Sequence, residues 1–180
     1  LSLSAHKLHA PKGIGLLYVK RRVKYQPYVV GGGQERGRRG GTENVASIVA
    51  FGRAAELAMA SLFDENTRVR ALRDRLEDGI LGAIPGTSRN GAREPRLPNT
   101  SNLAFEGVEA EGILMLLDQA GICASSGSAC TTGSLDPSHV LTAMGCSAGR
   151  ARSSIRFSLG IYNTEEEVEH VLKHLPGIIA

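Results

Sequence analysis

The cysteine at position 130 has the setting in this sequence that most suggests reactivity. It lies in ASSGSACTTGS, residues 124–134, a stretch that contains no large apolar side chain. Such a segment cannot anchor itself in a core, so we expect a mobile loop with a reachable thiol. A reachable thiol on a flexible loop suits nucleophilic attack followed by delivery of the captured group. Cys130 is therefore predicted to be a nucleophile.

The other two cysteines are not expected to take part in chemistry. Cys123 follows Ile122 and is interpreted as a small buried hydrophobe, whereas Cys146 receives no role. Three cysteines are an odd number, and their spacing is not that of a zinc site. The sequence therefore predicts neither a disulfide framework nor a structural metal site, and it favours a reducing compartment such as the cytosol.

A lysine at position 7 stands among small and polar residues just before an apolar run. In SAHK, residues 4–7, it follows Ser4 and His6. It could be a solvated surface residue. It could also form a Schiff base with a cofactor whose phosphate receives hydrogen bonds from Ser4 and His6. Position alone leaves both interpretations open.

A glycine-rich stretch, GGGQERGRRGGT, covers residues 31–42. It is not a P-loop because the terminal GK[ST] is missing, and it could simply form a turn. We expect Thr42 to stand at the start of a helix, where free backbone N–H groups could bind a phosphate.

Basic residues are concentrated at the beginning of the chain. Residues 1–39 contain nine lysines and arginines and one acid, Glu35. No run of aromatic residues for base stacking and no recognised nucleic-acid motif accompanies this charge, so a phosphate ligand or an acidic partner is preferred over nucleic acid. The longest apolar stretch, residues 44–62, contains Arg53 and Glu56, so we expect no membrane span. The first residues also lack the features of a signal peptide.

The hydrophobic pattern predicts strands that alternate with helices, as in an α/β protein. A strand buried on both faces is expected at 14–19, and a half-buried strand at 103–105. Another strand, at 155–159, should turn Arg156 away from its apolar face. Helices are expected at 44–62, from about 67, at 109–120, after Asp136-Pro137, and from a capping box that begins at Thr164. Residues 85–100 are expected to be exposed loop.

Four motifs together carry a resemblance to a known family. SAHK before PKGIGLLYV, GGGQERGRRGGTEN, SSGSAC and SSIRFSLG resemble the pyridoxal-phosphate cysteine desulfurases of the NifS/IscS type, in the class V aminotransferase family. The resemblance implies a fold-type I enzyme: residues 1–62 would end the large cofactor domain and include a connecting helix. Residues 63–180 would form a small α/β domain that carries the cysteine loop. The family's N-terminal half does not match any part of this chain, which is therefore expected to be inactive alone.

The resemblance also implies residue roles around pyridoxal 5'-phosphate. Lys7 would form the Schiff base with the cofactor, and Ser4 and His6 would bind its phosphate. Thr42 would reach the phosphate of the neighbouring subunit in a homodimer.

By the same resemblance the substrate is L-cysteine, which is converted to L-alanine. Arg156 would hold the substrate carboxylate, and Cys130 would become a persulfide. The sulfur would pass to an iron–sulfur scaffold or another acceptor protein, and Cys130 would contact metal only transiently, through a nascent cluster. The enzyme is expected to be cytoplasmic, without a nucleic-acid or membrane partner.

Two alternatives remain open from the sequence. One is another pyridoxal-phosphate enzyme, an aminotransferase or β-lyase that uses Lys7 and Arg156 without a thiol, although SSGSAC argues against it. The other is a noncatalytic module whose basic N-terminal segment binds an anionic partner.

Overall fold

A computed structural model describes residues 1–126 and 137–180 of the 180-residue chain. These residues form two compact units, Leu1–Leu62 and Phe63–Ala180. Most of the predicted cysteine loop, including Cys130, lies outside the described residues.

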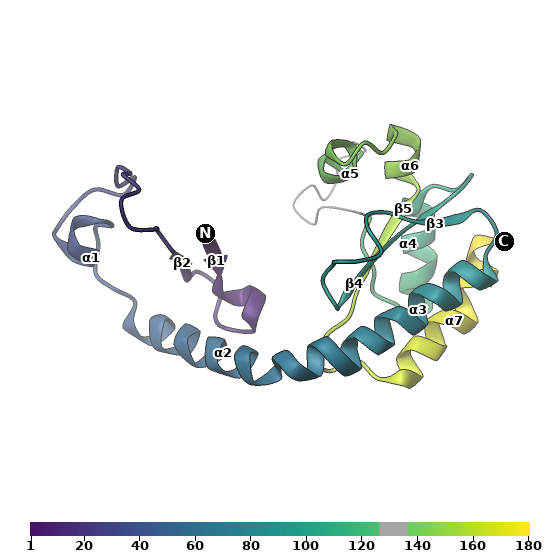
Figure 1. The fold of residues 1–180 in the computed structure, drawn as a ribbon, viewed down its shortest axis with the longest axis horizontal. Helices are drawn as coiled ribbons and strands as arrows, with labels where there is room; N and C mark the ends of the chain where they lie inside the picture. The colour runs from purple at the N-terminus through teal and green to yellow at the C-terminus, as the bar shows by residue number, and fades with distance from the viewer. Residues whose placement is uncertain (127–136) are drawn as a thin grey trace. The chain divides into compact units, whose positions relative to one another are not determined.

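The first unit begins with a small hairpin. Strand β1 (Ser2–Ser4) pairs antiparallel with β2 (Gly15–Leu17), and a 3₁₀ helix, η1 (Ala5–Leu8), lies between them (Figure 1). A Cβ atom on Gly15 would come within 2.7 Å of the Leu3 carbonyl oxygen, so glycine is required for this close pairing. Ala5, the first residue of η1, is fully buried and donates its N–H to the Ile14 carbonyl.

The predicted strand at 14–19 is shorter than expected, and it is exposed. Leu16 and Leu17 have exposed fractions of 47% and 61%. The predicted burial of both strand faces is therefore wrong for this structure. Among the described residues β2 pairs with β1 alone.

Two helices follow, and the second of them extends past the end of the first unit at Leu62. A single turn, α1 (Gln34–Gly37), lies in the glycine-rich stretch, and α2 (Val45–Asp64) follows it. Asn44 caps α2, because its Oδ1 accepts a hydrogen bond from the Ser47 N–H at 3.2 Å.

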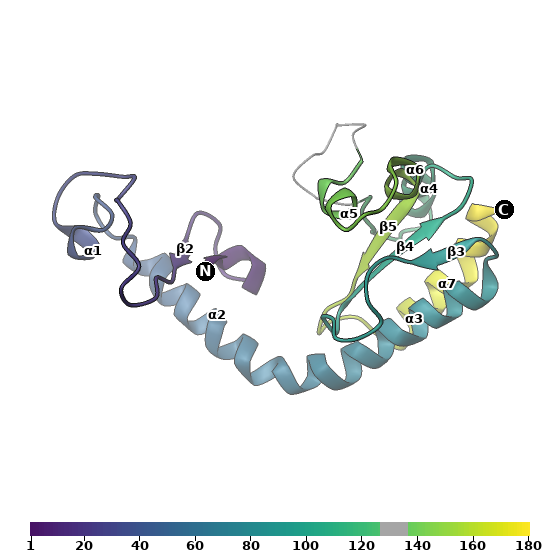
Figure 2. The same ribbon diagram turned by 45° about the horizontal axis from the view of Figure 1, so that its top comes forward.

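The second unit contains a three-stranded antiparallel sheet in the order β3-β4-β5 (Figure 2). Its strands are β3 (Thr87–Arg89), β4 (Thr100–Phe105) and β5 (Ser154–Ser158). Its helices are α3 (Arg70–Ala83), α4 (Ala110–Gln119), α5 (His139–Ala143), α6 (Ala148–Arg152) and α7 (Glu165–Ile179).

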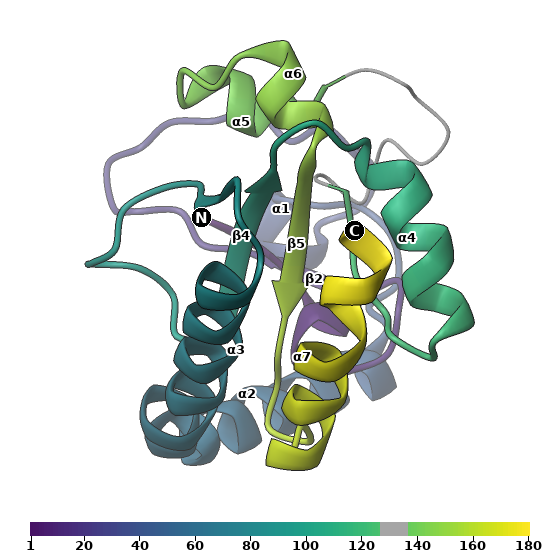
Figure 3. The same cartoon turned by 90° about the vertical axis from the view of Figure 1, so that its right-hand side faces the viewer.

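One hydrophobic core holds this unit together. Helices α3 and α7 lie side by side across the sheet (Figure 3), and α4 adds to the same core. Ile80, Leu103, Ile155 and Leu175 are each at most 1% exposed. Burying a side chain of this size stabilises a fold by about 1.5–3 kcal/mol. The predicted capping box of the last helix is confirmed, since Thr164 and Glu167 exchange hydrogen bonds.

The junction between α2 and α3 is helical without a break. A π-turn, Glu65–Val69, joins the two helices. From this turn Arg68 donates hydrogen bonds to the carbonyls of Ile161 and Asn163, at 2.7 and 2.8 Å. The π-turn thereby fixes the segment that connects β5 to α7.

Two sequence predictions for the second unit need correction, and one helix was missed. Residues 85–100 are not all exposed loop, because they include β3 and the buried Asn90. The helix predicted from Asp136 begins at His139 with Ser138 as its N-cap, while Asp136 itself lies outside the described residues. Helix α6 was not predicted, because five small and basic residues carry no hydrophobic period.

A buried carboxylate fastens the segment between β3 and β4. Glu77 on α3 is 2% exposed and accepts hydrogen bonds from Arg89, Arg96 and Ser101 at 2.6–2.8 Å. Burial raises the pKa of Glu77, but the hydrogen bonds from Arg96, Ser101 and Arg89 outweigh it and lower the pKa to about 2.

The helical stretch Val45–Ala83 is a candidate membrane span by its length and composition. It contains an 18-residue window with a mean hydropathy of 1.4, of which 11% is buried. Its length and composition alone would allow it to cross a bilayer, so Arg53 and Glu56 do not exclude a span by this criterion. This is weak evidence for one, because a core helix of a water-soluble protein meets the same test.

Candidate functional site

The candidate cofactor lysine lies in η1, in the turn of the β1–β2 hairpin. Ser4 is the N-cap residue, but its side chain makes no capping hydrogen bond, and His9 ends the helix with a φ of 62°. Ser4, His6 and Lys7 are exposed, whereas Ala5 anchors the turn. The hairpin thus presents a hydroxyl, an imidazole and an amine on neighbouring residues, a set that can receive a phosphate and an aldehyde.

The glycine-rich stretch closes on itself. Gly40 donates its N–H to the Val29 carbonyl at 2.9 Å, and a Cβ on Gly40 would lie 2.8 Å from the Gly31 nitrogen. Only glycine permits this contact. The Gly41 N–H donates a hydrogen bond to Gln34 Oε1 at 3.3 Å, which connects the middle of the loop to its end.

Thr42 follows this loop, is exposed, and does not start a helix. Helix α2 begins at Val45 behind the Asn44 cap. The expectation of Thr42 at the helix start is therefore wrong, because Asn44 provides the capping side chain. The predicted contact of Thr42 with a phosphate is not tested by this placement.

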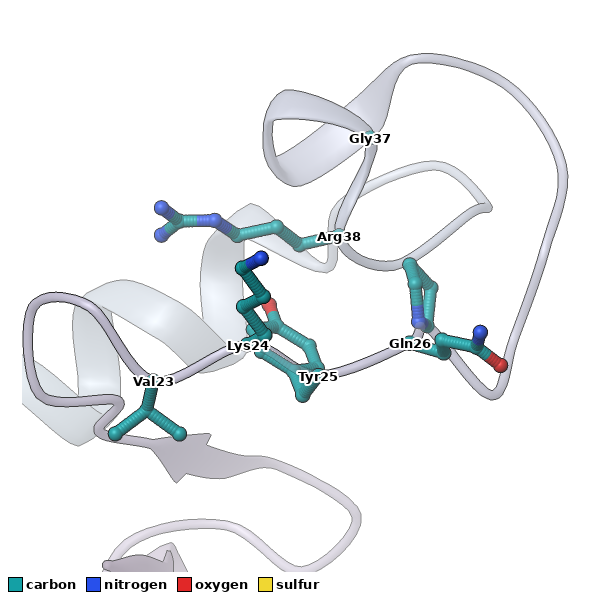
Figure 4. Close-up of a pocket in the computed structure, with 7 residues that line it drawn as sticks. Val23, Lys24, Tyr25, Gln26, Gly37 and Arg38 are labelled. Atoms are coloured by element: carbon teal, nitrogen blue, oxygen red, sulfur yellow. The ribbon is translucent and has the colours of Figure 1, made fainter.

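The basic N-terminal segment lines an open pocket of about 620 Å³. Figure 4 shows the two basic side chains that border it, Lys24 and Arg38. The lining residues are Val23, Lys24, Tyr25, Gln26, Pro27, Gly37 and Arg38. None of the predicted site residues is among them.

The candidate substrate arginine lies in the middle of β5. Ile155 and Phe157, its neighbours in the strand, are 0% and 3% exposed, so the predicted alternation is confirmed. The backbone of Arg156 is bonded to Ser125 in both directions: Arg156 N–H to Ser125 O at 2.6 Å, and Ser125 N–H to Arg156 O at 3.1 Å. This bridge fixes the start of the cysteine segment to the strand that carries Arg156.

The Arg156 guanidinium has an unused donor. Its Nε is buried and, within residues 1–126 and 137–180, has no hydrogen-bond partner. A buried unpaired donor costs about 1–3 kcal/mol, more for a charged group. A carboxylate that accepted this hydrogen bond would remove the cost, so Arg156 is suited to an anionic ligand.

The environments of the other cysteines differ from expectation in one case. Cys123 is exposed, and the prediction of a buried position is wrong, because Ile122 beside it, 7% exposed, takes the core position. Cys146 is half-buried, with its Sγ 3.7 Å from Asn90 Oδ1.

Sequence reasoning missed the polar cluster around Asn90. Arg150 Nε donates to Asn90 Oδ1 at 2.6 Å, and Asn90 Nδ2 donates to Asn102 and Ser154. No local sequence motif predicts these contacts, because the partners are 12 to 64 residues apart in the chain. The cluster fixes α6, which follows the cysteine segment in the sequence and directly precedes β5.

The described ranges contain no group of three or more His, Cys, Asp or Glu side chains that could hold a metal ion. The predicted transient metal contact of Cys130 lies outside them.

Comparisons with known proteins match the chain over nearly its whole length. The family model described as aminotransferase class-V matches residues 1–171. A cysteine desulfurase of Gluconacetobacter diazotrophicus is 60% identical over 180 residues, which are 100% of this chain and 45% of that protein. The cysteine desulfurase NifS of Azotobacter vinelandii is 55% identical over the same share of each chain.

The fold agrees with a solved structure as well. The X-ray structure of a NifS-like protein from Rickettsia africae has a TM-score of 0.86 and 33% identity, over 98% of this chain and 46% of that one. The chain therefore spans about 45% of the length of the curated relatives it matches.

Proposed function

Because this chain belongs to the aminotransferase class-V family, we propose that it forms part of a pyridoxal-phosphate-dependent cysteine desulfurase. The observation that carries the proposal is the bridge between Ser125 and Arg156. It joins the residue suited to a substrate carboxylate to the segment that contains Cys130. The relatives named cysteine desulfurase support the same activity.

The residues of the β1–β2 hairpin fit the cofactor. Lys7 would hold pyridoxal 5'-phosphate covalently, and Ser4 and His6 would bind its phosphate through the hydroxyl and the ring N–H. The Ser4 hydroxyl is not used as a helix cap, which supports this role. When bound, the cofactor supplies an electron sink that makes the carbon–sulfur bond of the substrate cleavable.

Arg156 would bind and orient the substrate. Its guanidinium would donate two hydrogen bonds to the substrate carboxylate, one of them from the buried Nε. The position of β5 in the sheet holds this side chain on a rigid element. Lys7, once its amine is free, would move protons at the substrate carbon.

Cys130 would capture the sulfur. Its thiolate attacks the sulfur of L-cysteine, a sulfur–sulfur bond forms, and the carbon–sulfur bond breaks. The electron pair stays with the carbon, which takes up a proton, so the products are L-alanine and a Cys130 persulfide. Ser125 and Cys130 are five residues apart, a span of at most about 18 Å, which keeps the thiol within reach of Arg156.

The proposal extends to the assembled protein. Two copies would form a homodimer in which Thr42 completes the partner's phosphate site. The persulfide sulfur would pass to an iron–sulfur scaffold or another acceptor protein in the cytoplasm. Neither nucleic acid nor a membrane is needed for this activity.

The test is an assay of a full-length protein that contains this chain, loaded with pyridoxal phosphate and supplied with L-cysteine. We expect equal amounts of alanine and, with a reductant, sulfide. After one turnover without reductant, mass spectrometry should find one added sulfur on Cys130. Pyruvate, ammonia and sulfide in place of alanine, formed equally well by Cys130→Ala, would favour a β-lyase. Transfer of the cysteine amino group to an added keto acid, without release of sulfide, would favour an aminotransferase. No turnover of any amino acid would favour a noncatalytic module.

A further inference from the structure

Two histidines on α7 form a close pair outside the proposed active site. His170 and His174 are one helical turn apart, and their ring centroids are 4.4 Å apart with an interplanar angle of 46°. This tilt is unlike a parallel stack of rings. Neither side chain has a role in the chemistry proposed above.

The hydrogen bond of one ring fixes which nitrogen is free. His170 Nε2 lies 2.9 Å from the Ala120 carbonyl oxygen, at the end of α4. A carbonyl oxygen only accepts, so Nε2 must carry the proton, and Nδ1 of the neutral ring has a lone pair. Histidines that bind metals almost always donate their other N–H in this way.

The separation of the ring centroids is short enough for both imidazoles to bind one ion. Metal–imidazole bonds are about 2.0–2.1 Å long, which puts a ring centroid about 3.2 Å from the ion. Two such rings at 90° would have centroids about 4.5 Å apart, and at a tetrahedral angle about 5.2 Å. The observed 4.4 Å is close to the shorter of these separations. Imidazole ligands suit late first-row ions, and affinity among these ions is highest for Cu²⁺.

The pair also stands on a rigid and electrostatically suitable element. Val168 and Leu175, at 3% and 0% exposure, fix α7 to the core. Glu166 lies one turn before His170 and adds negative charge to the first turn of the helix. The backbone that carries the two histidines is therefore fixed, and the bond to the Ala120 carbonyl holds the His170 ring as well.

We propose that His170 and His174 bind one divalent late first-row ion, Cu²⁺ or Ni²⁺, through one imidazole nitrogen each. Water completes the coordination, since no third protein ligand is placed within the described ranges. This site is independent of cysteine desulfuration.

The test is Cu²⁺ titration of a full-length protein that contains this chain, with all thiols alkylated, followed by electron paramagnetic resonance. We expect one Cu²⁺ per chain coupled to two imidazole nitrogens. His170→Gln and His174→Gln should each remove the two-nitrogen signal and weaken binding by about tenfold or more. His139→Gln, at an exposed histidine of α5, should change neither.

Thermal melting without metal checks that each variant folds. His174→Asn provides a second, smaller replacement if His174→Gln does not. A two-nitrogen signal that survives in the folded His174 variant, or the absence of such a signal in the unsubstituted protein, would overturn the proposal. Desulfurase activity is measured in parallel, and its loss or retention does not bear on the copper site.

Discussion

At the scale of single residues, the buried Nε of Arg156, which has no partner in the part of the chain that the structure describes, gives a sharp expectation. Arg156→Lys should raise the KM for L-cysteine by about tenfold or more, because an ammonium group cannot reproduce the two-point contact of a guanidinium. Steady-state kinetics of the full-length protein measures the change. Arg152→Lys, an exposed arginine at the end of α6, is the matched control. An unchanged KM in Arg156→Lys would contradict the carboxylate role.

The cysteines allow a second test at this scale. Cys130→Ala should abolish transferable sulfur, because no thiolate would receive the sulfur of the substrate. Its polar sequence neighbours predict a stability cost within about 0.5 kcal/mol. Mass spectrometry after one turnover and thermal melting measure the two effects.

Cys123→Ala is the control for this comparison. Since Cys123 is exposed, its replacement should also cost within about 0.5 kcal/mol and should leave persulfide formation intact. A sulfur adduct on Cys123 or Cys146 after turnover would contradict the assignment to Cys130.

At the scale of the elements, the Glu77 carboxylate connects α3 to the segment before β4. Glu77→Gln should lower the free energy of unfolding by about 3 kcal/mol at pH 7, because Arg89 and Arg96 lose their charged partner. Urea unfolding measures this difference. Glu169→Gln, which affects only an exposed pair with Arg75, should cost less than about 1 kcal/mol.

The same carboxylate predicts a pH dependence with a definite sign. Its pKa falls from 4.5 to about 2 on folding, so the unfolded chain binds the proton more readily. The stabilisation by Glu77 is therefore complete above about pH 4.5 and is lost as the pH falls toward 2. The difference in stability between the unsubstituted protein and Glu77→Gln should shrink over this interval, and a constant difference would contradict the assignment.

Elements with a local signal could be predicted from the sequence, and those defined by distant contacts could not. The capping box at Thr164 and the alternation around Arg156 are local patterns, and both are confirmed. Asn90 is buried through partners far along the chain, so its segment resembles an exposed loop. The exposure of Cys123 depends on which of two adjacent residues faces the core, which composition does not determine.

At the scale of the whole molecule, a shared active site predicts complementation between inactive subunits. In a mixed dimer of Lys7→Ala and Thr42→Ala chains, one site would carry both changes and the other neither. Random exchange should therefore restore up to about a quarter of the unsubstituted activity. Activity assays before and after exchange measure this recovery. If activity stays at the average of the two parent dimers, Thr42 does not serve the partner's site.

The backbone bridge between Ser125 and Arg156 has a consequence for how such a protein can diverge. The first residues of the cysteine segment are bonded through Ser125 to the backbone of Arg156, the residue suited to the carboxylate, and the Asn90 cluster fixes α6 beyond the segment. Insertions between these two anchors would lengthen the cysteine segment and leave the backbone of Arg156 in place. In the proposed enzyme, binding of the substrate carboxylate and transfer of the sulfur would then be able to diverge independently.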